Sequence, residues 1–395
     1  MIQFFGEIYF DSGPKPKENP MRQQFHSELD FRLDWRTGLS HIDLVVEFVL
    51  QIRAAMKRLL TLSVLLLLTS SPVFAQKIAK YAGEFMAIGV GGRALGMGGA
   101  YVAAGNDVTM GYWNPAGLML IDYPELALMH DERFGNLVNY DYGGVAIPLG
   151  PKYTLGIALT RLGIDGIPDT RNALIDYNGD NKFDPNDRLD YSKITTFSAT
   201  DWAMYVSYAV QLNSSTSMGA NLKLIRRDLA EASAMGVGFD VGILIRLLPE
   251  LYFGANVQDI TTTLIAWNNG TKELISPTAK VGMAYMIKAL GGTFTPALDV
   301  DIMAENRRYA SLVSAGPVSL NPRVGLEYRF KDLFAIRGGF TDTQSLTLGA
   351  GVHLPKLYID YSFAKFDGAD QLDNTHRISL RLTLQEAKFF RDRPR

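Results

Sequence analysis

In the stretch Thr375-His376-Arg377-Ile378-Ser379-Leu380-Arg381-Leu382-Thr383-Leu384, apolar and polar side chains alternate. Because successive side chains of a strand point to opposite faces, one face of this segment is apolar and the other carries arginines and hydroxyls. The same division recurs in residues 323–330 and 298–302. A soluble β-sandwich would alternate in the same way, so the pattern alone predicts strands without fixing their surroundings.

Strand length and the need for closure favour a membrane barrel. The alternating segments are about ten residues long, which suits a strand tilted across a bilayer. After residue 75 no apolar run approaches the roughly 20 residues of a membrane helix. An open sheet edge in hydrocarbon would leave backbone groups unpaired, so the sheet must close. The sequence predicts an all-β fold, a transmembrane antiparallel β-barrel over residues 121–384 with a polar tail over 385–395.

The expected number of strands is about fourteen, an even number as in single-chain bacterial barrels, with twelve or sixteen still open. The longer joins, around 164–193, 260–275 and 305–319, are expected to be extracellular loops. The expected strands begin near Glu125, Val138, Tyr153, Ile194, Thr216, Ala232, Leu251, Pro277, Phe294, Leu320, Leu333, Thr343, Lys356 and Asp373.

Composition excludes several classes of function. The net charge is -2, and there are no cysteines. Nucleic-acid binding requires an excess of clustered cations, so nucleic acid is not an expected partner. Without cysteine the chain has no disulfide scaffold, no Cys-ligated metal and no thiol nucleophile.

An export signal lies inside the sequence as given. Met56-Lys57-Arg58 precedes the apolar run Leu59–Leu68, and Val73 and Ala75 are the small residues before a cut ahead of Gln76. This order is typical of a secretory signal peptide over residues 56–75, although a buried core helix is the alternative. Residues 1–55 are then interpreted as an extension from a start codon assigned too early. If they are genuine, residues 42–52 could form a short amphipathic helix.

The segment 76–120 lacks strand alternation and is expected to fold into the lumen. Its stretches Gly92-Arg93-Ala94-Leu95-Gly96-Met97-Gly98-Gly99 and Trp113-Asn114-Pro115-Ala116-Gly117-Leu118 resemble the N-terminal hatch of FadL-like outer-membrane proteins, specifically the PorV/PorQ family. The resemblance implies a fourteen-stranded barrel closed by this hatch. The hatch motif comprises Gly92, Arg93, Gly96, Gly98, Gly99, Asn114, Pro115 and Ala116.

Arg93 is expected to pair with a lumen carboxylate, because an unpaired charge in a plugged lumen is costly. The candidates are Asp299, Asp301 and Glu327. The hatch glycines have an alternative, purely structural explanation, since they allow the chain to pack closely inside a narrow barrel.

The resemblance implies a non-enzymatic protein of the outer membrane of a Gram-negative-type bacterium. Its main implication is a PorV/PorQ-type role in type IX-like protein secretion or cargo hand-off at the cell surface, with secretion components and secreted proteins as partners. The alternative is FadL-like transport of long-chain fatty acids or other hydrophobic molecules, and a third hypothesis is a barrel whose loops only bind partners. The isolated histidines 130, 353 and 376, and the lack of G-x-S-x-G and H-E-x-x-H motifs, argue against catalysis.

One loop has the spacing of a calcium site and resembles dockerin and EF-hand loops. Side-chain oxygens at positions 1, 3, 5, 9 and 12 and a carbonyl at position 7 suit a hard cation. Asn181 replaces the usual glycine at position 6, and an aspartate replaces the final glutamate, so binding should be weak. The alternative is a solvated turn of Asx motifs. The expected Ca²⁺ ligands are Asp176, Asn178, Asp180, Lys182 through its carbonyl, Asp184 and Asp187.

Overall fold

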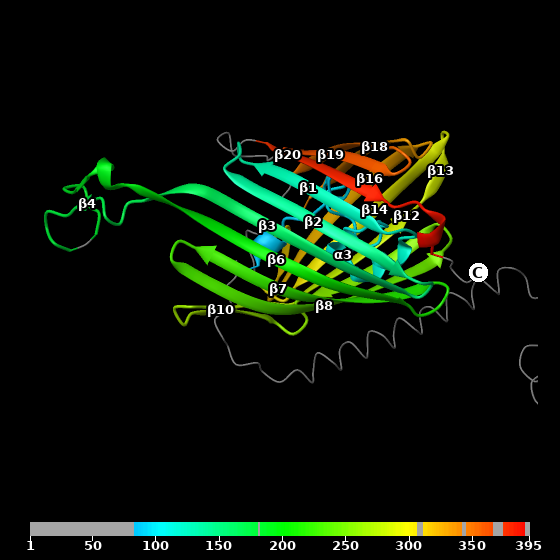
Figure 1. Ribbon diagram of the computed structural model, residues 1–395, viewed down its shortest axis with the longest axis horizontal. Helices are drawn as coiled ribbons and strands as arrows, with labels where there is room; N and C mark the ends of the chain where they lie inside the picture. Colours follow the sequence, from blue (N-terminus) through cyan, green and yellow to red (C-terminus); the bar gives the residue numbers. More distant parts are fainter. Residues whose placement is uncertain (1–82, 181, 306–310, 342–344, 366–373, 392–395) are drawn as a thin grey trace, which may run out of the picture. The chain divides into compact units, whose positions relative to one another are not determined.

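The computed structural model describes residues 83–180, 182–305, 311–341, 345–365 and 374–391. The predicted upstream extension, the signal peptide and residues 76–82 of the hatch lie outside this part. In the described residues, fourteen strands form the wall of a barrel (Figure 1). They are β1 (Glu125–Arg133), β2 (Val138–Leu149), β3 (Tyr153–Asp169), β6 (Thr195–Gln211), β7 (Thr216–Leu229), β8 (Ala232–Leu248), β9 (Leu251–Gln258), β12 (Thr278–Tyr285), β14 (Gly292–Met303), β16 (Val318–Phe330), β17 (Phe334–Phe340), β18 (Leu346–His353), β19 (Leu357–Lys365) and β20 (Thr375–Thr383).

Each wall strand pairs antiparallel with its neighbours in sequence, and the first strand closes the ring against the last. In this seam, β1 and β20 pair from Glu125 opposite Thr383 to Glu132 opposite His376. Closure removes the open edge that hydrocarbon would not tolerate. The predicted fold class is confirmed, and the observed strands begin within about three residues of the predicted positions, the usual uncertainty of such boundaries.

Long connections gather at one end of the barrel and short turns at the other, which makes the first end extracellular and the second periplasmic. The extracellular connections are more ordered than predicted. Strands β3 and β6 remain paired as far as Asp169 and Thr195, past a bulge between Ile164 and Ile167, so the first loop starts later than residue 164. Figure 1 shows these strands carrying the small hairpin of β4 (Leu174–Ile175) and β5 (Arg188–Leu189) away from the barrel.

The loop predicted over 260–275 contains a second hairpin, β10 (Thr263–Trp267) and β11 (Lys272–Ile275), because β8 is longer than β9 and its extra residues pair with β10. β15 (Val313–Ala315) pairs with β16 inside the loop predicted over 305–319. At the periplasmic end, β13 (Ile287–Ala289) forms a hairpin with β14.

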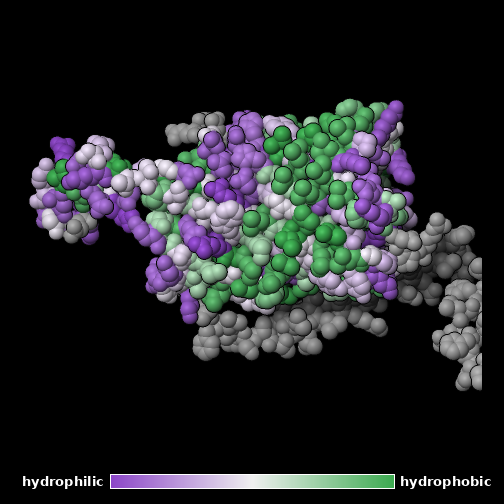
Figure 2. Space-filling model, in the orientation of Figure 1, coloured by the Kyte–Doolittle hydropathy of each residue, from purple (hydrophilic) through white to green (hydrophobic). Residues whose placement is uncertain are grey.

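The two faces of the wall match the alternation in the sequence. In β20, Ile378 and Leu380 are 49% and 41% exposed, whereas Arg377 and Ser379 are 5% and 9% exposed. The apolar side chains form a belt on the outside of the barrel (Figure 2), where lipid would cover them. None of the helices in the described residues has the length and apolarity to cross a membrane. An even-stranded single-chain barrel with such a belt is the architecture of bacterial outer-membrane proteins, and the protein is located there.

The inside of the barrel is filled by residues 83–120, called the plug below. It contains η2 (Glu84–Met86), α2 (Gly92–Gly96), α3 (Met110–Trp113) and η3 (Pro115–Leu120). Its aromatic residues Tyr101, Tyr112 and Trp113 are at most 1% exposed and form the centre of the core. The predicted hatch is therefore present in the lumen.

The described part of the predicted polar C-terminal tail, residues 385–391, contacts the barrel through one buried arginine. A short η6 (Ala387–Phe389) precedes Arg391, which is 2% exposed. Arg391 donates to the carbonyl of Met119 and to the hydroxyl of Thr154. The tail thus packs back against η3 at the periplasmic end.

Candidate functional site

The backbone of the plug packs closely against glycines of the wall strands. A Cβ atom added to Gly339 would lie 2.3 Å from the backbone nitrogen of Gly98, and one on Gly219 would lie 2.4 Å from that of Ala116. A Cβ atom added to Gly325 would likewise lie 2.4 Å from the carbonyl oxygen of Met97. Side chains at these wall positions would occupy the space of the plug backbone. We call these inward-facing wall glycines, Gly219, Gly325 and Gly339, the glycine seat.

The glycines of the predicted hatch motif have the matching role. Gly98 and Gly99 have φ angles of 65° and 77°, which favour glycine. Gly96 lies against the wall at Gly349, and a Cβ on Gly92 would meet the carbonyl oxygen of Asp360 at 2.8 Å. The motif glycines therefore let the plug turn and pack closely, which supports the structural explanation of their presence.

The Asn-Pro-Ala turn forms hydrogen bonds both within the plug and between the plug and the wall. The Asn114 side chain, 0% exposed, donates to the carbonyls of Val102 and Ile243, each at 3.0 Å, and accepts from the amide of Ala116 at 3.2 Å. Pro115 begins η3, where its missing N–H is not needed. All three predicted residues act together as one cap.

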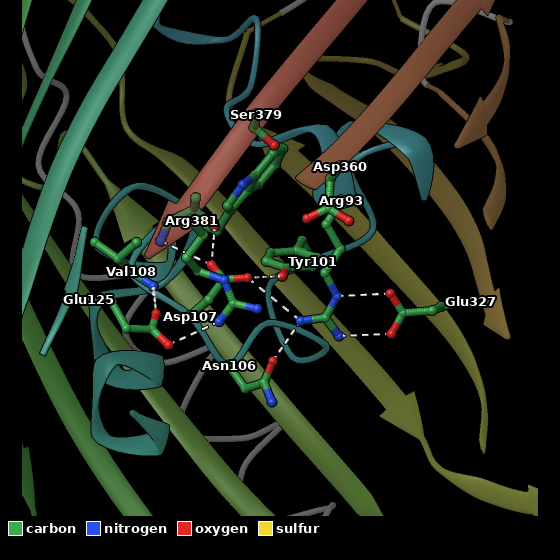
Figure 3. Close-up of polar contacts among 12 residues, drawn as sticks. Arg93, Tyr101, Asn106, Asp107, Val108, Glu125, Glu327, Asp360, Ser379 and Arg381 are labelled. Atoms are coloured by element: carbon green, nitrogen blue, oxygen red, sulfur yellow. Dashed lines mark hydrogen bonds and ion pairs between the residues drawn. The ribbon is translucent and has the colours of Figure 1, made fainter. Parts of the chain in front are cut away.

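Arg93 pairs with Glu327 of β16, one of its three predicted partners (Figure 3). Its Nε and Nη2 lie 2.8 and 2.9 Å from the two carboxylate oxygens. The other two candidates have different roles. Asp299 accepts the plug amides of Tyr101 and Val102 at 2.6 and 2.8 Å, and Asp301 pairs with Arg323 at 2.9 Å.

The charged contacts extend from Arg93 in two directions. Glu327 also binds Arg337 at 2.7 Å, and Arg337 lies 2.7 Å from Asp360. On the other side, Asp107 of the plug lies 3.6 Å from Arg93 and accepts a hydrogen bond from the hydroxyl of Tyr101. These contacts form a continuous buried network between the plug and strands β16–β19.

A second charged contact joins the plug to the seam. Glu125 of β1 accepts the amide of Val108 at 2.9 Å and pairs with Arg381 of β20 at 2.9 Å (Figure 3). The strands that close the barrel are thus tied to each other and to the plug by one carboxylate.

The later part of the plug is held by neutral side chains that sequence reasoning missed. They donate to backbone carbonyls of the plug that include those of Gly111, Trp113, Ala116 and Leu118. The signal that could have found them is a short polar residue at an inward-facing strand position. The donors are Asn221 at 2.8 Å, Asn256 and Ser217 at 3.0 Å, and Thr154 at 3.1 Å.

A cavity of about 190 Å³ lies on each side of the plug. The extracellular cavity combines apolar residues such as Leu95 and Trp113 with Arg133, Arg323 and Arg377. The periplasmic cavity is lined mainly by small and apolar residues, with polar groups that include Arg93 and Arg329. Its lining includes Ala103, Ala104, Leu120, Tyr252, Ala284 and Met286.

The predicted calcium ligands lie together in the β4–β5 hairpin. Asp176 accepts the amides of Asn178 and Gly179, and Asp187 accepts those of Tyr177 and Asp184. Asp180 accepts the amide of Lys182, and Asn178 donates to Asp184. No group of three or more His, Asp or Glu suited to a metal occurs in the described residues, which omit Asn181 of this loop. Calcium binding stays a prediction.

No family model matches the chain, and no curated protein matches it. Among solved structures, the toluene transporter TbuX of Ralstonia pickettii superposes with a TM-score of 0.50 at 13% identity, over 75% of this chain and 98% of that one. The monoaromatic hydrocarbon channel CymD gives a TM-score of 0.50 at 13% identity, over 76% and 98%. A Pseudomonas aeruginosa FadL homologue gives 0.48 at 12% identity, over 73% and 96%.

The chain shares the barrel fold of TbuX and CymD. The FadL-like part of the predicted resemblance agrees with this fold. None of these three structures is a PorV or PorQ protein, so the narrower resemblance stays a prediction.

Proposed function

We propose that the protein passes small hydrophobic molecules across the outer membrane and that the plug controls this passage. The observation that carries the proposal is the pair of cavities, one on each side of the plug, both partly apolar. Two proteins with the same fold are described as a toluene transporter and a monoaromatic hydrocarbon channel. The partners are outer-membrane lipid and a hydrophobic small molecule, and the protein is not an enzyme.

The first test is uptake. Gram-negative cells lacking their own hydrophobic-molecule channels, with and without this protein, are supplied with radiolabelled toluene. We expect faster uptake only in cells that contain the protein. Equal uptake, with folded protein in the outer membrane, would contradict the proposal.

The role of the plug is tested by engineered disulfides that fix it to the wall. The chain has no cysteine of its own, so the introduced pair is the only one that can form. A Cβ on Gly83 would lie 3.0 Å from Cγ2 of Ile275, and one on Gly111 would lie 3.0 Å from Oγ of Ser207. Both separations suit a disulfide. We expect the oxidised Gly83→Cys/Ile275→Cys variant to stop uptake, since it fixes the beginning of the plug to β11.

Reductant should restore uptake, and each single cysteine variant should behave as the unmodified protein. The Gly111→Cys/Ser207→Cys lock is the matched control, because it fixes a part of the plug that the wall already holds through hydrogen bonds. If uptake continues with both locks closed, the plug does not control passage.

The PorV/PorQ-type role in type IX-like secretion is the weaker proposal, because no solved structure above supports it. Secreted proteins or secretion components that remain bound to the barrel after gentle extraction, together with no uptake of toluene, would favour that role instead.

A further inference from the structure

The outer face of the wall carries charged side chains on one side of the barrel only. Among the described residues, the outward-facing positions of β8, β9, β12, β14, β16, β17 and β18 hold no charged side chain. Charged side chains face outward instead on β19, β1, β2, β3 and β7. They include Lys365, Glu132, Asp141, Arg161, Arg226 and Asp228.

Two of these cations form a row with a tryptophan. Arg161 of β3 lies opposite Trp202 of β6, and Trp202 lies opposite Arg226 of β7. Residues directly opposite each other in a sheet point to the same side. Thr160, the neighbour of Arg161 in the chain, is 0% exposed and faces the lumen, so the row faces outward. We call Arg161 and Arg226 the arginine pair.

The row lies directly beside the apolar belt, on its extracellular side. Two residues closer to the periplasm, the same three strands carry Leu159, Met204 and Leu224, of which the two leucines are 41% and 39% exposed. Figure 2 shows hydrophilic side chains along the edge of the belt nearest the projecting β4–β5 hairpin. Tryptophan is typical of the level at which lipid head groups begin. A lipid that covers the belt here therefore has its head group beside the arginine pair.

Both guanidinium groups turn away from the belt, towards the level of the head groups. A Cβ atom added to Gly163, the next outward residue of β3, would lie 2.8 Å from both Nη atoms of Arg161. This guanidinium therefore lies over a backbone position that has no side chain. On β7, the Nε of Arg226 lies 2.9 Å from Asp228. Thr200 is opposite both Gly163 and Asp228, so a hydroxyl residue separates the two cations.

The arginine pair keeps hydrogen-bond donors for a ligand. Arg161 approaches Asp141 with Nη1 alone, at 3.4 Å, and Arg226 uses Nε and Nη2 for Asp228. Within the described residues, the other guanidinium nitrogens of the pair have no acceptor. Exposed ion pairs of this kind contribute little to stability, but they hold each guanidinium in place. A phosphate offers several charged oxygens to such planar donors.

We propose that the arginine pair binds the phosphate-bearing head group of a lipid in the outer leaflet. Trp202 lies beneath the head group, and the acyl chains follow Leu159 and Leu224 along the belt. The inference does not depend on the proposed function, because the site lies on the outer face of the wall and includes no residue of the plug.

The test is native mass spectrometry of the whole protein in detergent, with lipid A that carries two phosphates as the probe and its dephosphorylated form as the neutral analogue. We expect the Arg161→Gln/Arg226→Gln variant to bind the phosphorylated lipid about tenfold more weakly, because two charge-assisted contacts are lost. Binding of the dephosphorylated lipid should not change. The matched control is Arg188→Gln/Lys193→Gln, which removes two exposed cations from the segment around the β4–β5 hairpin.

A second variant keeps both charges. Gly163→Val places a side chain where the guanidinium of Arg161 lies, so it should also weaken binding of the phosphorylated lipid, by less than the double variant does. The gel mobility of the unheated protein shows that each variant is folded.

Equal binding of the phosphorylated lipid by the arginine variant and its control would overturn the inference, as would an equal loss of the dephosphorylated lipid. A protein that stays bound to the barrel extracted from its own membrane, and is released by the arginine substitutions, would also overturn it. That result would assign this side of the wall to a protein partner.

Discussion

The two halves of the plug are held in different ways. Residues 83–108 meet charged partners: Arg93 binds Glu327, the amides of Tyr101 and Val102 bind Asp299, and that of Val108 binds Glu125. Residues 109–120 meet mainly neutral amides and hydroxyls of β3, β7 and β9, with Arg391 of the tail as the charged exception.

This difference indicates which half can be displaced. A neutral hydrogen bond to a carbonyl contributes modestly to stability, and other charges change this contribution little. The contribution of a buried ion pair depends strongly on whether each charge keeps its partner. A ligand that brings its own charge into the lumen would compete with the first half and leave the second in place. We therefore expect the later half to act as the anchor and the earlier half to be the part that a charged ligand displaces.

The largest loss of stability is expected from a feature that both halves share, their close packing against wall glycines. Gly339→Val and Gly219→Val insert a side chain into the backbone of the first and second half, at 2.3 and 2.4 Å. We expect each to destabilise the plugged barrel by more than about 4 kcal/mol, which is exceptional for one substitution. The measurement is the unfolding temperature, together with the gel mobility of the unheated protein.

Gly338→Val is the control for this pair, because a Cβ at that outward position meets nothing closer than 3.9 Å. A folded Gly339→Val protein of normal stability would show that the glycine seat is not needed.

An intermediate effect should separate the two halves. Arg93→Met leaves a buried carboxylate with one cation fewer and should cost about 3–5 kcal/mol. Asn256→Ala leaves the carbonyl of Trp113 without its donor and should cost about 1–3 kcal/mol. Denaturant titration in detergent measures both.

The double variant Arg93→Met/Glu327→Gln should recover part of the stability lost in Arg93→Met, because the buried carboxylate that has lost one of its two arginines is then neutral, while Arg337 keeps its ion pair with Asp360. The comparison between the halves breaks down if Asn256→Ala is as damaging as Arg93→Met, or if the double variant recovers nothing.

The smallest effect is predicted outside the plug, at the β4–β5 hairpin. With a dissociation constant on the order of 0.1–1 mM, as in extracellular calcium modules, about 1 mM calcium would stabilise the bound form by roughly 0.4–1.4 kcal/mol. Isothermal titration of the chelator-stripped protein should show a heat of binding that disappears in Asp180→Ala and persists in Asp165→Ala. Uptake should not depend on calcium. An identical heat in the Asp180 variant would refute the site.

Local pattern was enough to predict the wall and the presence of the plug. Alternation in segments such as residues 375–384 depends only on which face meets lipid, and this is encoded residue by residue. The pairing of Arg93 with a lumen carboxylate followed from the cost of a buried charge. The cost of a buried charge does not, however, predict that Arg93 pairs with Glu327 and not with Asp299. These contacts join residues about two hundred positions apart in the chain.

Other features were missed for related reasons. An inward-facing glycine such as Gly339 is unfavourable in a strand when the strand is considered alone. Its role, leaving room for the plug backbone, is apparent only when the plug is placed against it. The sequence predicts only a loop where the β10–β11 hairpin lies, because the pairing of this hairpin depends on β8 extending beyond β9. A recess at the periplasmic mouth combines residues of the β13–β14 hairpin and of the turn between β16 and β17, which no local pattern brings together.

The glycine seat also has a consequence for the order of assembly. Residues 83–120 precede every wall strand in the chain, yet they pack against strands from β3 to β20 and end inside a ring closed by β1 and β20. At Gly339 the wall and the plug lie so close that even one Cβ atom between them would come within 2.3 Å of the plug nitrogen of Gly98, so a segment this closely enclosed cannot enter a finished cylinder. The last hydrogen bonds of the wall must therefore form around a plug already in place, so that the first segment of the barrel region to be synthesised serves as the template on which the cylinder closes.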